Sequence, residues 1–425
     1  MICWSEKSRP LRAPKAIRDL SISGLPIYDL TPAVYNISSP MHRVYLDNNA
    51  TTPLLPEVFD AMRPYFIEHF GNASSIHHYG QATRAAIERA RESVADLLGC
   101  KNSEIVFTSG GTESDNLAIF GLAHPGDHII TSTIEHHAVM NACTHLEKKG
   151  CEVTSIPVDY RGQVDPDDVK RALRPNTKLI TIMTANNETG VLQPVEEIGR
   201  IAADADVYFH TDAVQAAGKI PIDTGKINCD LLTISGHKLH GPQGIGALYV
   251  RKGTKLEAML HGGSHERTRR AGTENVPGIV GLGKAAELAQ SAFARGDDRT
   301  MCALRDRLEC ALRQIDGTGT NGEGAPRVPN TASIYFEHIE GESLVIALDL
   351  KGLAVSGGAA CSSGAVEPSH VLTAMGLPPA RARASLRFSL GKQNTDCDID
   401  FAIDLVPAAV AHLRALSPTC PRVHV

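Results

Sequence analysis

Lys238 stands in a stretch whose composition favours a reactive amine. Residues 235–244 read SGHKLHGPQG, with an apolar run at 231–234 before them and another at 245–250 after them. Burial between two core strands disfavours the charged form of an amine, so a lysine there is readily kept neutral. A neutral lysine is a nucleophile that condenses with carbonyl groups. The alternative for this motif alone is a surface lysine in a glycine-rich turn.

Cys361 is the second candidate nucleophile. It lies in residues 355–364, VSGGAACSSG, which are almost wholly small. Such residues cannot bury much apolar surface, so we expect a mobile loop here. An exposed thiol on a flexible arm suits a nucleophile that enters a site and then carries a group away. The plainer alternative is an incidental cysteine in a tight glycine turn.

Asp212 and His136 are candidates for holding a planar aromatic ligand. Asp212 directly follows the strand-like run 207–211, so it emerges from a sheet, where a carboxylate can hold the proton of a pyridinium ring. His136 could stack on such a ring. The plainer alternatives are a capping aspartate and a structural histidine. Residues 135–137, EHH, make a poor metal site because the second-histidine spacing of H-E-x-x-H is missing.

Two further positions suit the binding of anions. Gly111 and Thr112 open a predicted helix, where free backbone N–H groups attract phosphate. The alternative is an ordinary turn with Thr112 as the N-cap. Arg387 lies in an alternating strand at 385–389, and an arginine on a rigid element suits a bidentate grip on a carboxylate. The alternative there is a surface salt bridge.

Helical and strand-like segments alternate along the chain. We expect helices and strands at 81–98, 104–108, 113–122, 128–131, 178–184, 207–210 and 230–234. Alternation of this kind predicts an α/β fold with a doubly wound, mainly parallel sheet. Because ligands of such sheets bind beyond the carboxyl ends of the strands, we expect the polar groups that follow these strands to share one site.

Composition excludes several classes of protein. The 425 residues are 42% hydrophobic and carry a formal net charge of −6, which argues against a nucleic-acid-binding role. No apolar run reaches the ~18–20 residues needed to span a bilayer, and no signal peptide is evident. Ten cysteines occur without a C-x-x-C pair, which indicates free thiols in a reducing cytosol and a cytoplasmic protein.

The chain divides into three expected parts. Residues 1–42 carry scattered basic residues and prolines without helical periodicity, so we expect a poorly ordered extension, and translation starting at Met41 is one hypothesis for it. Residues 43–290 form a large domain and residues 291–425 a smaller α/β domain. Within the smaller domain we expect a loop, a strand and two helices at 316–329, 331–336, 343–350 and 398–416.

Together these stretches resemble the cysteine desulfurases, enzymes of the class-V aminotransferase family that have the fold type I of pyridoxal 5′-phosphate (PLP) enzymes. The resemblance spans about Val44 to Pro418. It rests on YLDNNATT at 45–52, FGN at 70–72, TESDN at 112–116, ANNETG at 185–190, HTDAVQ at 210–215, SGHK at 235–238, RAGTEN at 270–275, and AC at 360–361 with EPSH at 367–370. The Asp47-Asn48-Asn49 opening is most similar to the nitrogen-fixation (NifS) branch, with the housekeeping IscS type close behind. The long segment around Cys361 differs from the SufS-type branch.

The resemblance implies a role for each motif residue in holding PLP. Lys238 would bind the cofactor covalently, His136 would stack on its ring and move protons, and Asp212 would pair with the ring nitrogen. The remaining cofactor-binding residues would be Gln215 and Asn187 at the ring and Gly111, Thr112, Ser235 and His237 at the phosphate. Thr273 would reach the phosphate bound by a partner subunit, so a homodimer is implied.

The resemblance also implies the reaction. Asn187 and Arg387 would bind the carboxylate of L-cysteine, and Cys361 would receive its sulfur as a persulfide while L-alanine is released. The persulfide would pass to an iron–sulfur scaffold or another acceptor protein, and the Cys361 thiol is itself a candidate for a transient cluster ligand. Departures from the family pattern are Gly357-Gly358-Ala359, where serines are usual, and Gln243, where lysine is common.

Alternatives remain open on the sequence alone. A selenocysteine lyase or an aminotransferase would share Lys238 and Asp212, although an aminotransferase would not need Cys361. A housekeeping iron–sulfur or tRNA-thiolation desulfurase would share every motif. A non-catalytic scaffold that relays sulfur or iron through Cys361 would bind no PLP.

Overall fold

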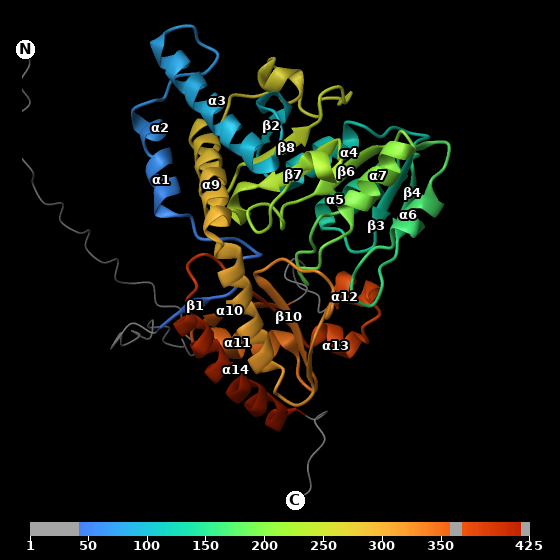
Figure 1. Cartoon of the computed structure of the whole chain (residues 1–425), viewed down its shortest axis with the longest axis vertical. Helices are drawn as coiled ribbons and strands as arrows, with labels where there is room; N and C mark the ends of the chain where they lie inside the picture. The colour runs from blue at the N-terminus through green and yellow to red at the C-terminus, as the bar shows by residue number, and fades with distance from the viewer. Residues whose placement is uncertain (1–41, 358–367, 418–425) are drawn as a thin grey trace, which may run out of the picture. The chain divides into compact units, whose positions relative to one another are not determined.

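The computed structural model describes residues 42–357 and 368–417 (Figure 1). Its largest sheet has the strand order β2-β8-β7-β6-β5-β3-β4, and β8 runs antiparallel to both of its neighbours while the other pairs are parallel. The strands are β2 Ile105–Thr108, β3 His128–Ser132, β4 Glu152–Ile156, β5 Thr177–Thr181, β6 Tyr208–Asp212, β7 Leu231–Ser235 and β8 Gly246–Val250. The predicted mainly parallel sheet is confirmed.

Helices cover both faces of this sheet, as a doubly wound fold requires. Alternate strand residues point to opposite sides: Ile130 and Phe209 belong to a core shared with α3 and α9, whereas Ile129 and Leu179 belong to a second core shared with α4 and α5. The helices are α1 Pro56–Met62, α2 Pro64–Ile67, α3 His78–Leu98, α4 Gly111–Phe120, α5 His137–Glu147, α6 Pro166–Ala172, α7 Val195–Asp204, α8 Thr224–Ile227 and α9 Val276–Arg295.

The pairing of α3 with α9 illustrates how the sequence produces this packing. The buried residues of α3 include Ile87, Ala90 and Val94, which the predicted helical spacing placed on one face. At Gly283 of α9, a Cβ atom would lie 2.6 Å from the Cα of Ala90, so only glycine permits this close approach. The two helices therefore pack with their backbones nearly in contact (Figure 1).

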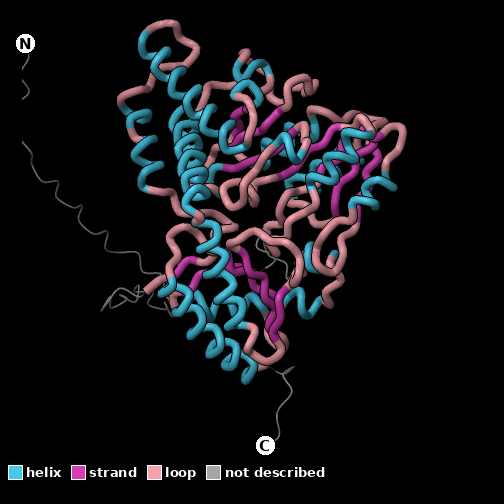
Figure 2. The backbone as a smooth tube through the Cα atoms, viewed as in Figure 1, coloured by secondary structure: helices cyan, strands magenta, loops and turns pink. Residues whose placement is uncertain are grey.

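The C-terminal part forms a core of its own around an antiparallel sheet of order β12-β13-β10-β9, beside the β1–β11 pair (Figure 2). Val44 and Leu46 pack into this core with residues from 304 to 410, although we expected the large domain to begin at residue 43. The elements are β1 Val44–Tyr45, α10 Asp297–Leu312, β9 Thr318–Thr320, β10 Thr331–Phe336, α11 Gly341–Asp349, β11 Leu353–Ala354, β12 Ser356–Gly357, α12 His370–Ala374, α13 Pro379–Arg383, β13 Ser385–Ser389 and α14 Asp396–Leu416.

Two local predictions were wrong, and a third was right about the strand but did not foresee its burial. The second predicted helix begins at Gly111, so Thr112 lies inside α4 and Gly110 is the N-cap. The strand carrying Arg387 is β13, in which Leu386 and Phe388 pack into the smaller core and Arg387 faces the cavity, but both of its faces are buried. The expected loop at 316–329 contains β9, which pairs with β10 and extends the smaller sheet.

A buried ion pair fixes the segment that leads to Thr273. Arg91 on α3 donates to both carboxylate oxygens of Glu266 at 2.8 Å, and Glu266 also accepts from the backbone N–H of Phe107. Both partner side chains are 5% exposed. The pair holds a turn in which Glu266, Arg267 and Thr268 have φ of 45°, 56° and 67°, a region that non-glycine residues adopt only under constraint.

Glu266→Gln tests this constraint. The substitution leaves the charged, buried Arg91 with only the half-exposed Glu88 as a carboxylate partner, so we expect the free energy of unfolding to fall by about 3 kcal/mol. Urea unfolding of the apoprotein measures the loss. Asp400→Asn is the matched control, because it breaks an exposed pair with Arg307 that is worth less than about 1 kcal/mol. Equal losses in the two variants would show that the buried pair does not hold the turn.

Candidate active site

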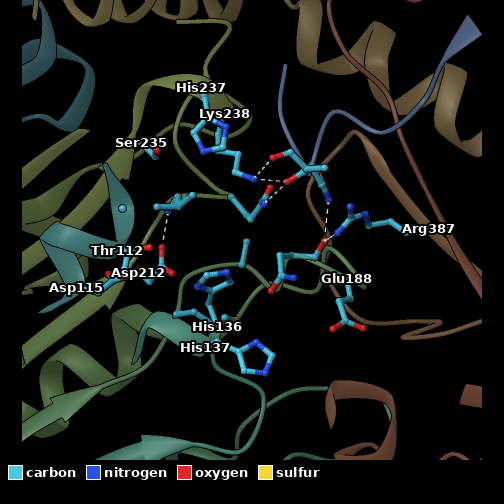
Figure 3. A pocket seen from close by; sticks show the side chains of 18 of the residues that line it. Thr112, Asp115, His136, His137, Glu188, Asp212, Ser235, His237, Lys238 and Arg387 are labelled. Carbon is cyan, nitrogen blue, oxygen red and sulfur yellow. Dashed lines mark hydrogen bonds between the residues drawn. The ribbon is translucent and has the colours of Figure 1, made fainter. Parts of the chain in front are cut away.

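A cavity of about 360 Å³ opens where the parallel strands of the large sheet end. Figure 3 shows side chains from separate elements directed toward this common space. Of the twelve residues singled out from the sequence, the ten that line the cavity are Gly111, Thr112, His136, Asn187, Asp212, Gln215, Ser235, His237, Lys238 and Arg387. The structure thus gathers most of the predicted set in one place.

Two predicted residues are not part of this lining. Thr273 is exposed and does not line the cavity. Cys361 lies outside the described residues. The residues that follow its segment, Pro368 to His370, do line the cavity, so the chain resumes its described course at the site.

Lys238 is held at the cavity by backbone carbonyls. It ends a 3₁₀ turn, Gly236–Lys238, that follows β7 directly. Its Nζ donates to the carbonyl oxygens of Asn49 at 2.5 Å and Ala50 at 2.6 Å. The neighbouring His237 shares a 3.1 Å hydrogen bond with Thr51. The motif therefore lies against residues 49–51 at the cavity, where Lys238 is half-buried, rather than in an exposed turn.

Asp212 is a buried carboxyl at the end of β6. Its Oδ1 accepts from the backbone N–H of Val214 at 2.8 Å. Burial raises the pKa of Asp212 to about 6, while the Val214 N–H and the charge of Lys238 lower it. Beside it, burial and the Asp212 charge raise the pKa of Asp115 well above its usual value, and Asp115 Oδ1 has no hydrogen-bond partner among the described residues. A cation bound here would relieve this clustering of acids.

The start of α4 forms a cradle suited to an anion. No side chain caps this ten-residue helix, so its first backbone N–H groups remain available at the cavity. Gly111 is tightly placed, since a Cβ there would lie 2.9 Å from Val214 Cγ2. Thr112, Ser235 and His237 line the same cavity. These donors match a phosphate group, as the cofactor of the resemblance requires.

His136 is both a structural cap and a cavity residue. It is the N-cap of α5, where its Nδ1 accepts from the backbone N–H of Ala138 at 3.2 Å. Burial, followed by the charge of Lys238, lowers the pKa of His136 to about 4. The ring is therefore neutral at physiological pH, and the Nδ1 contact assigns its proton to Nε2. His136 is therefore both the N-cap of α5 and a wall residue of the cavity.

Arg387 brings the smaller sheet into the site. Its Nη2 donates to Asp47 Oδ1 at 2.8 Å and its Nη1 to the carbonyl oxygen of Asn187 at 2.9 Å. The side chain is 4% exposed, which excludes a surface salt bridge. Its Nε is buried and has no acceptor among the described residues. An unpartnered guanidinium N–H at a cavity wall is suited to a carboxylate ligand.

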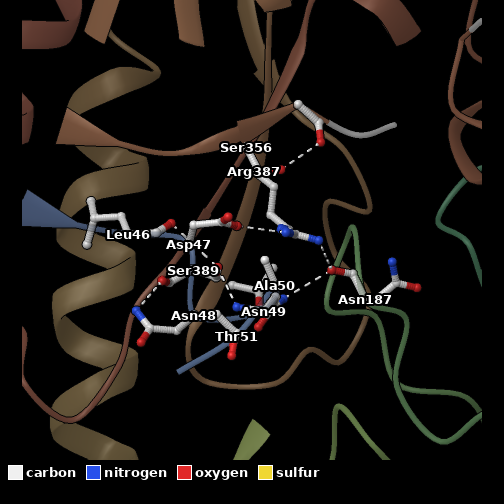
Figure 4. Close-up of polar contacts among 12 residues, drawn as sticks. Leu46, Asp47, Asn48, Asn49, Ala50, Thr51, Asn187, Ser356, Arg387 and Ser389 are labelled. Atoms are coloured by element: carbon white, nitrogen blue, oxygen red, sulfur yellow. Dashed lines mark hydrogen bonds and ion pairs between the residues drawn. The ribbon is translucent and has the colours of Figure 1, made fainter. Parts of the chain in front are cut away.

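Asn49 connects these groups, and sequence reasoning assigned it no role (Figure 4). Its carbonyl oxygen accepts from Lys238 and from Gln215 Nε2. Its side-chain Nδ2 donates to the Asn187 carbonyl at 3.1 Å and to Thr331 Oγ1 at 2.9 Å. One residue thereby touches the amine, the expected substrate side and the smaller sheet. The only signal in the sequence was its place in the Asp47-Asn48-Asn49 opening.

Glu188 is a second residue that the sequence left without a role. It lines the cavity and accepts a hydrogen bond from the Ser369 hydroxyl, which also caps α12. Burial raises the pKa of Glu188 to about 7, against the lowering effects of Ser369 and Arg387. The contact joins the loop after β5 to the start of α12.

Two features are absent from residues 42–357 and 368–417. None of the helices there is both long enough and apolar enough to cross a membrane. No group of three or more His, Cys, Asp or Glu side chains in those ranges gathers where a metal ion could be held. Glu135, His136 and His137 accordingly do not form such a site.

Comparison with known proteins agrees with this geometry. Residues 44–401 match the family model described as aminotransferase class-V. A protein of Methanosarcina thermophila named cysteine desulfurase IscS is 54% identical over 391 residues, covering 91% of this chain and 96% of that protein. A solved NifS-like protein is similar with a TM-score of 0.81 and 38% identity, covering 87% of this chain and all of its own. SspA, solved in complex with cysteine, is similar with a TM-score of 0.72 and 39% identity, covering 81% of this chain and 98% of the SspA chain.

The parallel sheet, the cavity at its strand ends and these likenesses define a class-V aminotransferase fold with the site of a PLP enzyme. The chain belongs, within that family, to the PLP-dependent cysteine desulfurases.

Glu188→Gln tests the electrostatics of the cavity. With a folded pKa of about 7 against 4.5 when exposed, Glu188 favours its protonated form in the folded chain. The ionised form of Glu188 destabilises the folded chain. This destabilisation is absent below pH 4.5, grows as the pH rises, and reaches its full value of about 3 kcal/mol above pH 7. We expect the wild-type apoprotein to lose that much more unfolding free energy than Glu188→Gln between pH 4.5 and 8.

Urea unfolding at a series of pH values measures the difference. Glu196→Gln, at an exposed position in the first turn of α7, is the control and should follow the wild type. The other buried acids of the site titrate in all three proteins and cancel in the comparison. If the unfolding free energies of the wild type and Glu188→Gln had the same pH dependence, the raised pKa assigned to Glu188 would be wrong.

Proposed function

We propose that this enzyme converts L-cysteine to L-alanine and takes up the released sulfur as a persulfide on Cys361. The observation that carries the proposal is the meeting of a lysine amine, a buried carboxyl and an unsatisfied arginine in one cavity: Lys238, Asp212 and Arg387. The likeness to a protein solved with cysteine supports the choice of substrate. The large domain, residues 43–290, would hold the cofactor, and the smaller domain, residues 291–425, would supply Arg387 and Cys361.

The residues that would hold PLP follow from their positions. Lys238 would bind its aldehyde carbon, Asp212 its ring nitrogen, and the start of α4 with Ser235 and His237 its phosphate. Gln215 would offer the second N–H of its amide to the ring, because the Asn49 carbonyl accepts from Nε2 and Lys219 occupies the carbonyl oxygen of Gln215 at 2.6 Å. His136 lies at the cavity wall as a neutral ring suited to stacking. When bound, PLP supplies an electron sink that stabilises negative charge at the substrate Cα.

The chain's own groups would handle the substrate and its protons. Arg387 Nε and the Asn187 side chain would bind the substrate carboxylate, which fixes the Cα beside Lys238. The Lys238 amine, released from the cofactor, would remove the Cα proton. Asp212 in its ionised form would keep the ring nitrogen protonated. The Nε2–H of His136 is available to a group above the ring, since its Nδ1 is occupied by Ala138.

The last step, the transfer of sulfur, would take place at Cys361. Its thiolate would attack the sulfur of the substrate, the carbon–sulfur bond would break, and that electron pair would remain on the carbon that becomes the alanine methyl group. The new sulfur–sulfur bond leaves a persulfide on Cys361. Its sulfur would then pass to an acceptor protein.

A homodimer completes the proposal. Thr273 is exposed and does not line the cavity of its own chain, and Arg270, three residues before it, is paired with Glu113 of α4 at 2.8 Å. Large apolar side chains that are exposed between residues 59 and 79 are Phe59, Phe66, Ile67, Phe70, Ile76 and Tyr79. A surface of this kind is suited to burial against a second copy. Thr273 would then reach the partner's phosphate.

The destination of the sulfur is iron–sulfur cluster assembly, and we assign it to the nitrogen-fixation branch on the Asp47-Asn48-Asn49 opening. The second candidate is a housekeeping role, which the IscS name of the Methanosarcina thermophila protein favours. Growth of a deletion strain on dinitrogen and on ammonium separates them. A defect on dinitrogen alone supports the first role, and a defect on both nitrogen sources supports the second.

Two variants test the desulfurase assignment. Cys361→Ala should still bind PLP but release no sulfide from L-cysteine in the presence of reductant. Lys238→Ala should neither capture the cofactor covalently nor turn over. Assays of sulfide and alanine measure both, and Cys310→Ala, an exposed thiol on α10, is the control expected to retain full activity.

Other outcomes identify the rivals. Unchanged sulfide release by Cys361→Ala would remove Cys361 as the acceptor. A new amino acid formed from an oxo acid would indicate an aminotransferase. Alanine formed from selenocysteine but not from cysteine would indicate a selenocysteine lyase. A purified protein that stays colourless with added PLP would favour a non-catalytic scaffold.

A further inference from the structure

The short helix α12 follows the smaller sheet's β12 in the chain but packs against segments that belong to the large sheet (Figure 1). Two of these residues follow β3 and β5, and the shared apolar core consists of Ile134, Met183, Val371, Leu372, Met375 and Ala382. The described chain resumes at Pro368, just before α12, after ending at Gly357. Residues 358–367, which include Cys361, thus connect β12 to an element seated on the large sheet.

Ser369, at the start of α12, contacts a carboxyl of the cavity wall. Its hydroxyl donates to Glu188 Oε2 and accepts from the backbone N–H of Leu372 at 3.2 Å. Ser369 and Glu188 are 3% and 4% exposed, so water does not compete for this hydrogen bond. One side chain therefore both caps α12 and ties the helix to the loop after β5.

His370 forms a second contact at the same place. Its Nε2 donates to the carbonyl oxygen of Glu135 at 3.0 Å, and its ring lies 4.9 Å from the ring of His137. Glu135 and His137 flank His136, the N-cap of α5. The start of α12 is thereby held by the turn that carries a cavity histidine as well as by Glu188.

Glu188 is itself firmly placed. Its backbone N–H donates to Asn186 Oδ1 at 2.9 Å, and Asn186 Nδ2 donates to the carbonyl oxygen of Ile134 at 3.1 Å. Burial raises the pKa of Glu188 to about 7, so its carboxyl is costly for stability, as is typical of functional positions. None of the reaction steps above uses this carboxyl.

The other end of the Cys361 segment, residues 358–367, also begins at the site. β12 ends at Gly357, and Ser356 before it pairs with Arg387 on β13. A nucleophile tethered at two ends is confined to a smaller volume than one tethered at a single end. Its effective concentration within that volume is correspondingly higher.

We propose that Glu188 is a positioning residue for sulfur transfer, because by binding Ser369 it fixes the end of the Cys361 segment at the cavity. The inference rests on the proposed role of Cys361. In the step that it assists, the Cys361 thiolate forms a bond to the substrate sulfur, the carbon–sulfur bond breaks, and its electron pair remains on the carbon. Glu188 exchanges no proton or electron in this step and acts only through Ser369.

A single turnover of the PLP-loaded enzyme with L-cysteine tests the proposal. The absorbance change of the cofactor reports substrate binding, and mass spectrometry reports the persulfide on Cys361. Ser369→Ala and Glu188→Ala should keep the absorbance change and its dependence on cysteine concentration, but form persulfide about tenfold more slowly. Because both losses come from one hydrogen bond, the double variant should be no slower than either single variant.

Thr373→Val is the matched control. The Thr373 hydroxyl donates to the carbonyl oxygen of Ser369 at 2.8 Å within α12, so its removal loosens the same helix and leaves the contact with Glu188 in place. Persulfide should form at the wild-type rate in this variant. Melting temperatures identify the variants that fold, and amide hydrogen exchange of residues 369–376 should rise in Ser369→Ala and Glu188→Ala. Either single variant suffices for the test when the other does not fold.

Three results would overturn the proposal. Persulfide could form at the wild-type rate in both single variants. The absorbance change could be lost together with persulfide formation, or Thr373→Val could slow transfer as much as Ser369→Ala, and either result would indicate a general loss of structure. Cys361→Ala is run in parallel: if it still releases sulfide and alanine, the role of Cys361 itself is wrong, which is a failure distinguishable from an unchanged rate.

Discussion

The backbone carbonyl and side chain of Asn49 hold together groups that lie far apart in the sequence. Lys238 and Gln215 bind its carbonyl oxygen, while its amide donates to the Asn187 carbonyl and to Thr331. These contacts come from the large sheet, from the loop after β5 and from the smaller sheet. The position of the amine relative to the arginine on β13 therefore depends on one short segment that enters between the two cores.

Burial dominates the electrostatics of the cavity. It raises the pKa of Asp212 and Glu188 to about 6 and about 7, and it lowers those of His136 and His237 to about 4. Each shift favours the uncharged form. A site whose charges are suppressed by burial is suited to a charged ligand, because a bound phosphate, ring nitrogen or carboxylate restores those charges.

Much of the fold and site followed from the sequence because the relevant signals are local. Apolar strands alternate with periodic helices, and the motif residues follow those strands directly, so the sheet and the clustering of Asp212, Lys238 and Asn187 were predictable. The N-cap of α4 was misplaced by two residues because Gly110 and Gly111 permit an earlier helix start. The burial of β13 was missed because its second face is covered by segments remote in the chain.

The roles of Asn49 and Glu188 could not be predicted in this way. Each depends on a partner distant in sequence, such as Thr331 for Asn49 and Ser369 for Glu188. A single asparagine or glutamate in a polar motif carries no local sign of such a contact.

Covalent capture of the cofactor by Lys238 is the central claim, and its most direct test is reduction of the PLP-loaded enzyme with borohydride followed by peptide mapping. Reduction makes the bond between lysine and cofactor permanent. We expect the modified peptide to contain residues 235–244 with the added mass on Lys238. A modified peptide carrying the cofactor on any other lysine, Lys219 included, would contradict the account.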